Sequence, residues 1–136
     1  MPGYSGTPLA KKLGFNKEPL SVVVYGEPEG YREWLGVVPE GVRFSNRARK
    51  VIEAAHVFTS KRNDLAKRLE MLRGRLAQTG FVWISWPKKS SKVPSEVTED
   101  TIRELALPLG FVDIKVCAVS EIYSGLKLVI RKSERR

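Results

Sequence analysis

The chain has 136 residues, of which 42% are hydrophobic and 29% charged, a composition typical of one folded domain rather than a disordered segment. Its apolar runs are about as long as a β-strand, too short for the roughly 18 residues of a membrane-spanning helix, and the N-terminus lacks the apolar core of a secretory signal. A single cysteine and a single histidine exclude an intramolecular disulfide and leave too few ligands for a zinc cluster. We therefore expect a cytoplasmic protein with no membrane segment and no metal site.

The formal net charge is +9 and the isoelectric point lies near 9.9. A basic chain of this kind attracts acidic partners, which are nucleic acids, phosphorylated metabolites or anionic lipids. Part of the excess lies at residues 131–136, which we expect to form a solvated basic tail. Charge alone therefore indicates a class of partner and says nothing of the fold.

The first half of the chain is expected to alternate short helices and strands. TPLAKKLG (7–14) predicts a short helix with Thr7 as its cap and Pro8 in its first turn. SVVVYG (21–26) predicts a buried strand, and EGYREWLG (29–36) a short helix with its aromatic residues on the inner side. A strand at GVRFS (41–45), a polar helix at NRARKVIEA (46–54) and a central strand at AHVFTS (55–60) follow.

The clearest predicted helix is NDLAKRLEMLRGRLAQTG (63–80), because four of its leucines recur at the spacing of one helical face. Ser60 or Asn63 is expected to cap its start, and Gly80 to end it. The remaining elements are a strand at FVWISW (81–86), a helix that Thr98 caps (98–110), and two strands (112–119 and 124–132) that form an antiparallel hairpin.

Strands that alternate with helices predict a mostly parallel sheet with helices on both faces, and the closing hairpin adds an antiparallel edge. No interior linker or internal repeat divides the sequence. We therefore expect residues 1–136 to form one α/β domain, a Rossmann-like three-layer fold. Residues 1–19 are its N-terminal arm and short helix.

The order of these elements over residues 20–132 resembles the class I methyltransferase fold, whose sheet also closes with a β-hairpin. In that family the loop after the first strand has the form VLDLGCGTG and surrounds the methionine part of S-adenosylmethionine (SAM). The equivalent run here is VVVYGEPEG, in which Gly26 and Gly30 match the outer glycines. The resemblance implies SAM or its product S-adenosylhomocysteine (SAH) as the candidate cofactor.

The sequence also departs from that family. Val24 replaces the acid of the loop, and Pro28 replaces the middle glycine with a ring and without an N–H donor. The second strand ends in Ser45 and Asn46 rather than in the acid that holds the ribose, and the chain is one strand short. These changes argue against methyl transfer.

A second resemblance covers essentially the whole chain. It is carried by GYSGTPLAKKLG, WISWPKKSSKV, LALPLGFVDIKVCAV and YSGLKLVIRK, which are similar to a bacterial family termed domain of unknown function 3052. That family implies a small cytoplasmic protein with no assigned reaction.

Open α/β sheets bind ligands outside the carboxyl ends of their strands, where the strand order reverses. We expect this point to lie between strands 21–26 and 55–60, where the loops GEPEG, TSKR and WPKKSSK meet. Their lysines and the helix N-termini that follow favour an anionic ligand, whereas two glutamates in GEPEG disfavour a phosphate and tolerate an amine or a ribose hydroxyl. The candidate ligand-binding residues are Gly26, Glu27, Gly30, Lys61, Arg62, Trp86, Lys88, Lys89 and Lys92.

Other residues have simpler interpretations. Trp86 is expected either to stack on a base or, by preference, to pack the edge of the sheet. His56 has no acid beside it in the sequence and Cys117 alternates within a strand, so both are expected to be structural. Residues 4–6 are a candidate lid, and no residue is assigned a catalytic role.

Three functions follow from these observations. The leading hypothesis is a non-catalytic, methyltransferase-like domain that binds a small anionic or nucleotide-like ligand. The first alternative is a divergent SAM-dependent methyltransferase. The second is a nucleic-acid-binding protein, suggested by the charge and by Trp83, Trp86 and Tyr123 near basic residues, although Lys67, Arg68, Arg73 and Arg75 do not form one stripe on their helix.

Overall fold

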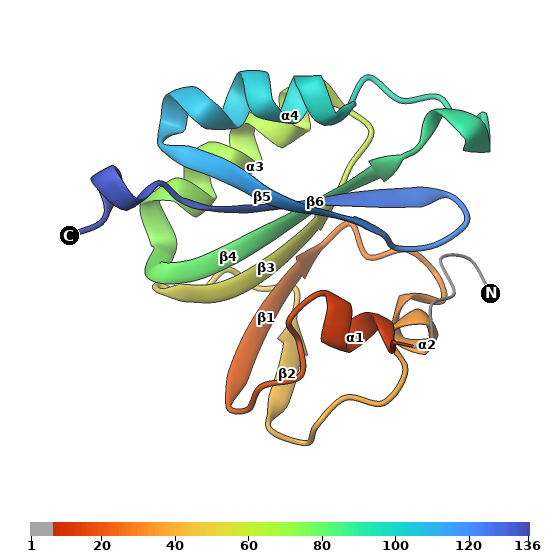
Figure 1. Cartoon of the computed structure of the whole chain (residues 1–136), viewed down its shortest axis with the longest axis horizontal. Helices are drawn as coiled ribbons and strands as arrows, with labels where there is room; N and C mark the ends of the chain where they lie inside the picture. Colours follow the sequence, from red (N-terminus) through yellow and green to blue (C-terminus); the bar gives the residue numbers. More distant parts are fainter. Residues whose placement is uncertain (1–6) are drawn as a thin grey trace.

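A six-stranded β-sheet with the order β2-β1-β3-β4-β6-β5 forms the centre of the protein (Figure 1). It is seen in a computed structural model that describes residues 7–136. The strands are β1 (Leu20–Tyr25), β2 (Val42–Ser45), β3 (Ile52–Phe58), β4 (Leu76–Pro87), β5 (Phe111–Ala118) and β6 (Tyr123–Ile130). The helices are α1 (Leu9–Lys12), α2 (Tyr31–Leu35), α3 (Arg62–Arg75) and α4 (Glu99–Ala106), with short 3-10 turns at η1 (Lys89–Ser91), η2 (Leu107–Leu109) and η3 (Lys132–Glu134).

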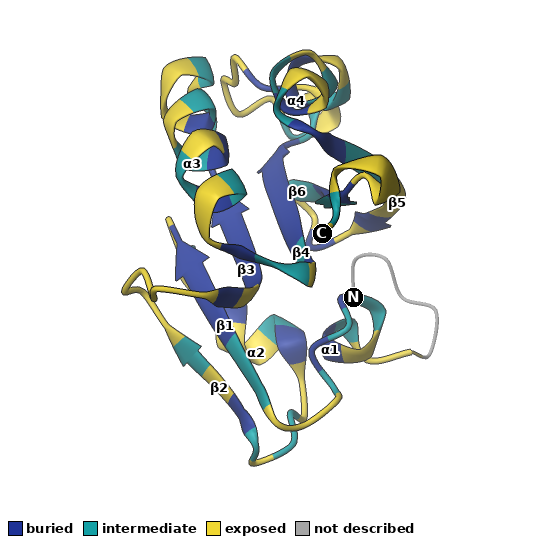
Figure 2. Ribbon diagram, turned by 90° about the vertical axis from the view of Figure 1, so that its left-hand side faces the viewer, coloured by how far each residue is buried: buried dark blue, intermediate teal, exposed yellow. Residues whose placement is uncertain are grey.

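Strand direction divides the sheet into two parts. Strands β2, β1, β3 and β4 run parallel, whereas β6 is antiparallel to β4 and β5 is antiparallel to β6. Helices α3 and α4 cover one face, and α1 and α2 cover the other (Figure 2). The predicted three-layer α/β fold with a closing hairpin is therefore confirmed. No helix among residues 7–136 is long and apolar enough to cross a membrane.

The two faces of the sheet have separate cores. On the α3 face, Leu65, Leu69 and Leu72 are fully buried, and burial of each such side chain stabilises the fold by about 1.5–3 kcal/mol. On the α1 face, Trp83 is fully buried and its Nε1–H donates to the carbonyl oxygen of Leu13 at 2.8 Å. This bond holds the segment after α1 against the sheet.

The predicted end of the long helix is wrong. Helix α3 ends at Arg75, and Leu76 has extended backbone angles and pairs with Ile52 as the first residue of β4. Leu76 is buried in β4, and the leucine stripe also predicts burial for it on a helix, so the pattern could not separate helix from strand. Gly80 lies inside β4 rather than at a helix end, and a Cβ there would lie 2.8 Å from the carbonyl oxygen of Glu53.

The predicted polar helix over residues 46–54 is also wrong. Residues 46–51 form an exposed connection, and β3 begins at Ile52, which is fully buried. Strand β3 pairs with both β1 and β4, so the sheet pairing overrides the helix propensity of the alanines and basic residues in this run. The connection between β2 and β3 therefore contains no helix.

The caps follow the prediction at one helix and not at two others. Thr98 caps α4, where its Oγ1 accepts the N–H of Thr101 at 3.3 Å and the Oγ1 of Thr101 accepts the N–H of Thr98 at 3.1 Å. Helix α1 begins at Leu9 after Pro8, without a cap from Thr7. Neither Ser60 nor Asn63 caps α3.

Tyr25 provides a test of the core on the α3 face. Its hydroxyl is buried and has no hydrogen-bond partner among the described residues. Tyr25→Phe removes this unsatisfied group, so we expect the free energy of unfolding to stay constant or rise by about 1 kcal/mol in urea denaturation. Tyr31→Phe is the matched control, because the Tyr31 hydroxyl lies 2.8 Å from His56 Nδ1, and it should lower that free energy by about 1–2 kcal/mol. Equal losses in the two variants would contradict this assignment.

Candidate functional site

The strand order reverses at β1. Strand β2 pairs with one side of β1, and β3 pairs with the other. The chain therefore passes from β1 to β2 in one direction and then crosses back past β1 to reach β3. The reversal point predicted between residues 21–26 and 55–60 is confirmed, since it lies between β1 and β3. Crevices at such points are where open α/β sheets bind their ligands.

The loop after β1 has a conformation that requires glycine at both ends. Gly26 has φ +69°, and a Cβ there would lie 2.4 Å from the carbonyl oxygen of Phe58. Gly30 has φ +88° and immediately precedes α2. The carboxyl ends of β1 and β3 are thus held in close backbone contact, and both outer glycines of the methyltransferase-like run are needed for this turn.

The same loop carries acidic side chains. Glu27 is exposed and lies 3.4 Å from Arg32, whereas Glu29 is exposed and has no ion pair with any described residue. The carbonyl oxygen of Pro28 accepts the N–H of Tyr31 at 3.2 Å, so the proline takes part in the turn. This loop therefore disfavours a phosphate group and favours a cation or a hydroxyl.

The start of α3 is not open to an anion in the way that was expected. The backbone N–H of Arg62 donates to Glu96 Oε1 at 2.9 Å, and the backbone N–H of Glu96 donates to the carbonyl oxygen of Ser60 at 2.8 Å. The Arg62 guanidinium is paired with Glu104 at 2.8 Å, whereas Lys61 is exposed. A carboxylate of the protein itself therefore occupies the positive end of this helix.

The lysine-rich loop lies beyond the carboxyl end of β4. The backbone N–H of Lys88 donates to the carbonyl oxygen of Ile122 at 2.8 Å, which joins this loop to the turn between β5 and β6. Lys89 and Lys92 are exposed, and none of the three lysines forms an ion pair with a described residue. Trp86, by contrast, is only 6% exposed and belongs to the core on the α3 face, as the core-packing interpretation requires.

A buried polar cluster around His56 lies on the face of the sheet that α1 and α2 cover. The sequence alone did not predict it. His56 Nδ1 is 2.8 Å from the Tyr31 hydroxyl, and His56 Nε2 is 2.7 Å from Ser85 Oγ. The imidazole stacks on Phe58 with ring centroids 4.2 Å apart, and burial lowers the pKa of His56 to about 3. The ring is therefore neutral and fully enclosed, which makes it structural rather than a general base.

The remaining candidates are quickly placed. Cys117 is a free, buried thiol on β5, and burial raises its pKa. Half-buried Trp34 and Tyr123 lie with ring centroids 6.3 Å apart and extend the aromatic cluster of Phe58. The candidate lid at residues 4–6 lies outside the described residues.

Comparison with known proteins agrees with this geometry at the level of the fold. A scan of protein-family models finds no match to the sequence, and a search of curated proteins finds none. Among solved structures, a SAM-dependent methyltransferase from Aquifex aeolicus is similar, with a TM-score of 0.63 and 14% identity over 88% of this chain and 86% of that one.

Two further structures are similar. The fibrillarin pre-rRNA processing protein of Methanococcus jannaschii has a TM-score of 0.52 and 12% identity, over 96% of this chain and 76% of its own. DhpI in complex with SAH has a TM-score of 0.53 and 12% identity, over 82% of this chain and 77% of its own. The chain therefore has the Rossmann-like fold of the class I methyltransferases. Within that fold, it is a six-stranded form whose β2–β3 connection has no helix.

Proposed function

We propose that the chain is a divergent SAM-dependent methyltransferase-like domain that binds SAM or SAH at the carboxyl ends of β1 and β3. The observation that carries this proposal is the Gly26 turn at the point where the strand order reverses. The fold neighbours add support, since one of them is a complex with SAH.

The charges around the turn favour this ligand over a phosphate-bearing one. SAM carries a cationic sulfonium, a cationic ammonium and one carboxylate, a net charge of about +1, and the exposed carboxylates of Glu27 and Glu29 would attract its cationic groups. A phosphate would meet these two carboxylates, and the first backbone donor of α3 is already taken by Glu96. The leading hypothesis of an anionic ligand therefore has less support than its adenosyl-ligand alternative.

The residues present fit part of the ligand. The backbone of residues 26–30 would enclose the methionine part, with Pro28 contributing a carbonyl group but no N–H donor. When bound, SAM supplies an electrophilic methyl group. His56 is sealed in the core, so this chain's own contribution is binding and orientation of the ligand rather than proton transfer by that imidazole.

Calorimetric titration with SAH at low salt, on protein free of co-purified ligand, tests the proposal. We expect a Kd in the micromolar range, which corresponds to about 8 kcal/mol. The double variant Glu27→Gln with Glu29→Gln should weaken binding by roughly fivefold to tenfold, because the carboxylates lose their attraction for the cationic ammonium. Glu33→Gln with Glu40→Gln removes the same charge from exposed positions outside the turn and should leave the Kd within about twofold.

The absence of both heat and thermal stabilisation at millimolar SAH would refute the proposal. Stabilisation by inorganic phosphate that is lost in Lys88→Ala with Lys89→Ala would instead support a small anionic ligand at the lysine-rich loop.

A further inference from the structure

The sheet face beside α3 is only partly covered. Parallel strands are usually joined by a helix that packs on the sheet, yet the connection from β2 to β3 is the helix-free segment 46–51. Arg43 on β2 is in register with Ser21 on β1, so its side chain lies on the same face as Ser21 and Val23, the face that α3 covers. Beyond α3, this face is therefore lined by polar and basic residues.

The positive charge of the chain is concentrated in this region. Residues 43–75 contain ten of the 24 Lys and Arg residues but three of the 15 Asp and Glu residues, which gives a net charge of +7 out of +9. We define the arginine face by the six basic residues on β2, on the connection, and on the flank of α3 that faces them. They are Arg43, Arg47, Arg49, Lys50, Arg68 and Arg75.

The two flanks of α3 use their arginines differently. Towards α4 and the C-terminus, Arg62 is paired with Glu104 at 2.8 Å and Arg73 with Glu134 at 3.6 Å. On the opposite flank, the Arg68 guanidinium lies 3.9 Å from the centroid of the Tyr25 ring, and Arg75 Nη1 donates to the carbonyl oxygen of Arg49 at 3.3 Å. No ion pair among the described residues involves the arginine face. Its cations thus have no ion-pair partner among the described residues.

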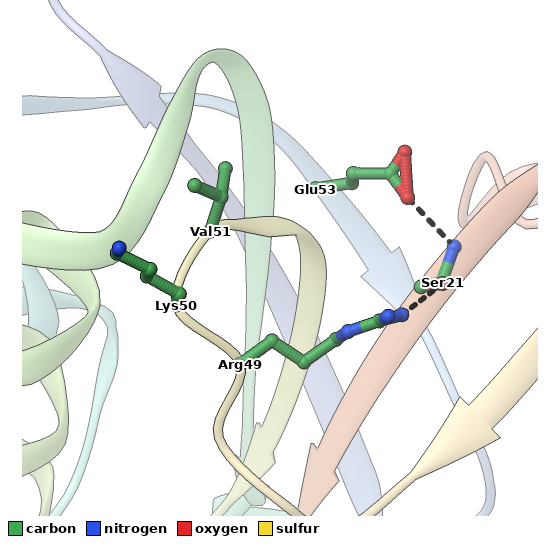
Figure 3. A pocket seen from close by; sticks show the side chains of 5 residues that line it. All are labelled: Ser21, Arg49, Lys50, Val51 and Glu53. Atoms are coloured by element: carbon green, nitrogen blue, oxygen red, sulfur yellow. Dashed lines mark hydrogen bonds between the residues drawn. The ribbon is translucent and has the colours of Figure 1, made fainter.

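A hollow of about 690 Å³ lies within this face, lined by Ser21, Arg49, Lys50, Val51 and Glu53 (Figure 3). Arg49 Nη1 donates to Ser21 Oγ at 2.7 Å, and Glu53 Oε1 accepts the backbone N–H of Ser21 at 3.0 Å. These bonds hold a guanidinium over the start of β1. Glu53 Oε1 is engaged with the backbone N–H of Ser21, and no ion pair joins this carboxylate to an arginine among the described residues.

We propose that the arginine face binds the phosphate backbone of a nucleic acid. Guanidinium groups present planar pairs of donors that match phosphate oxygens, and five of the six residues are arginines. Six cations spread over several elements fit a chain of phosphates better than one small anion. A membrane surface fits less well, because Val51 is the one exposed large apolar residue of the connection and no apolar wedge accompanies the charges.

Fluorescence anisotropy with labelled single-stranded RNA and duplex DNA of about 20 residues per strand tests this at about 50 mM salt. The test variant is Arg43→Gln, Arg47→Gln and Lys50→Gln, whose side chains form no hydrogen bond with a described residue. The matched control, Lys88→Gln, Lys89→Gln and Lys92→Gln, removes the same charge from another edge of the molecule. We expect the test variant to weaken binding at least tenfold and the control less than about threefold.

The salt dependence adds a second readout. The slope of log K against log salt is negative, and its magnitude should be smaller by about two to three in the test variant. Each lost phosphate contact reduces that magnitude by about 0.7–0.9. The triple variant Arg43→Lys, Arg47→Lys and Lys50→Arg keeps the charge and should retain binding, which controls for folding. Equal weakening by test and control variants, no binding at low salt, or tighter binding to phosphatidylserine vesicles than to either oligonucleotide would overturn the proposal. SAH titration is independent of all three outcomes.

Discussion

Acidification from pH 6.5 towards pH 3 is expected to destabilise the protein through His56, on the order of 1 kcal/mol per pH unit and roughly 4 kcal/mol in all. The unfolded chain binds a proton on this imidazole near pH 6.5, whereas burial lowers the pKa in the folded state to about 3. Between these values the unfolded state holds more protons, so stability rises with pH and falls as the pH drops. Above pH 6.5 the contribution of His56 is complete and constant.

NMR provides the measurement, because His56 is the single histidine of the chain and its ring signals need no deconvolution. We expect no titration of these signals between pH 8 and about pH 5, and a midpoint near 6.5 would contradict the buried neutral ring. Urea denaturation adds the energetic test. The difference in unfolding free energy between the wild type and His56→Gln should narrow by about 1 kcal/mol per pH unit below 6.5.

His56→Ala should lower the free energy of unfolding by about 4 kcal/mol at pH 7. It opens a cavity in the core and leaves the hydroxyls of Tyr31 and Ser85 without their partner. Ser85→Ala removes one hydrogen bond and is expected to lower it by only about 1–2 kcal/mol. If His56→Ala were no more damaging than Ser85→Ala, the imidazole would not be the centre of this cluster.

Gly26→Ala is expected to lower the free energy of unfolding by about 3 kcal/mol and to abolish SAH binding. A left-handed backbone at φ +69° disfavours alanine by about 1–2 kcal/mol, and the added Cβ would be 2.4 Å from the carbonyl oxygen of Phe58. Relief of that contact requires the ends of β1 and β3 to move apart. Since the proposed ligand site lies between them, binding and stability should be lost together.

Substitutions at Gly36 and Gly74 distinguish the effect of backbone strain from that of a steric clash. Gly36 has φ +78° and ψ −148°, a region that is almost restricted to glycine, with nothing within 4 Å of its Cβ position, so Gly36→Ala tests backbone strain alone and should cost about 1–3 kcal/mol. Gly74 lies in α3 with open space around it, and Gly74→Ala should stabilise the protein by about 0.5–1 kcal/mol. Both variants should bind SAH normally. Loss of SAH binding in Gly36→Ala as complete as in Gly26→Ala would contradict the account.

The fold was predictable because its main signals are local. Strand β1 is a short apolar run that ends at a glycine, and Thr98 begins a helix with its own capping partner three residues away. The predicted C-terminal end of helix α3 was wrong, because Leu76 fits both the leucine spacing of a helix and the burial expected of a strand residue. Periodicity alone cannot resolve a residue that both patterns accept.

The candidate sites depend on contacts between distant segments, and these were not visible in the sequence. Glu96 accepts the first backbone N–H of α3 from 34 positions away, a contact that the sequence of the loop did not suggest. The sequence indicates no single stripe that joins Arg68, Arg73 and Arg75 on their helix. The structure places them on two different flanks of α3. Arg73 turns to Glu134, whereas Arg68 and Arg75 join the connection between β2 and β3. The arginine face therefore emerges only when three segments are brought together.

The central claim is that an adenosyl ligand binds where β1 and β3 end, and a two-dimensional ¹H–¹⁵N NMR titration with SAH tests it most directly. We predict that the backbone amides of Gly26, Glu27, Glu29, Gly30 and residues 59–61 shift with a common micromolar Kd, while those of the arginine face stay in place. An unchanged spectrum at millimolar SAH, or shifts confined to residues 43–50, would contradict the claim.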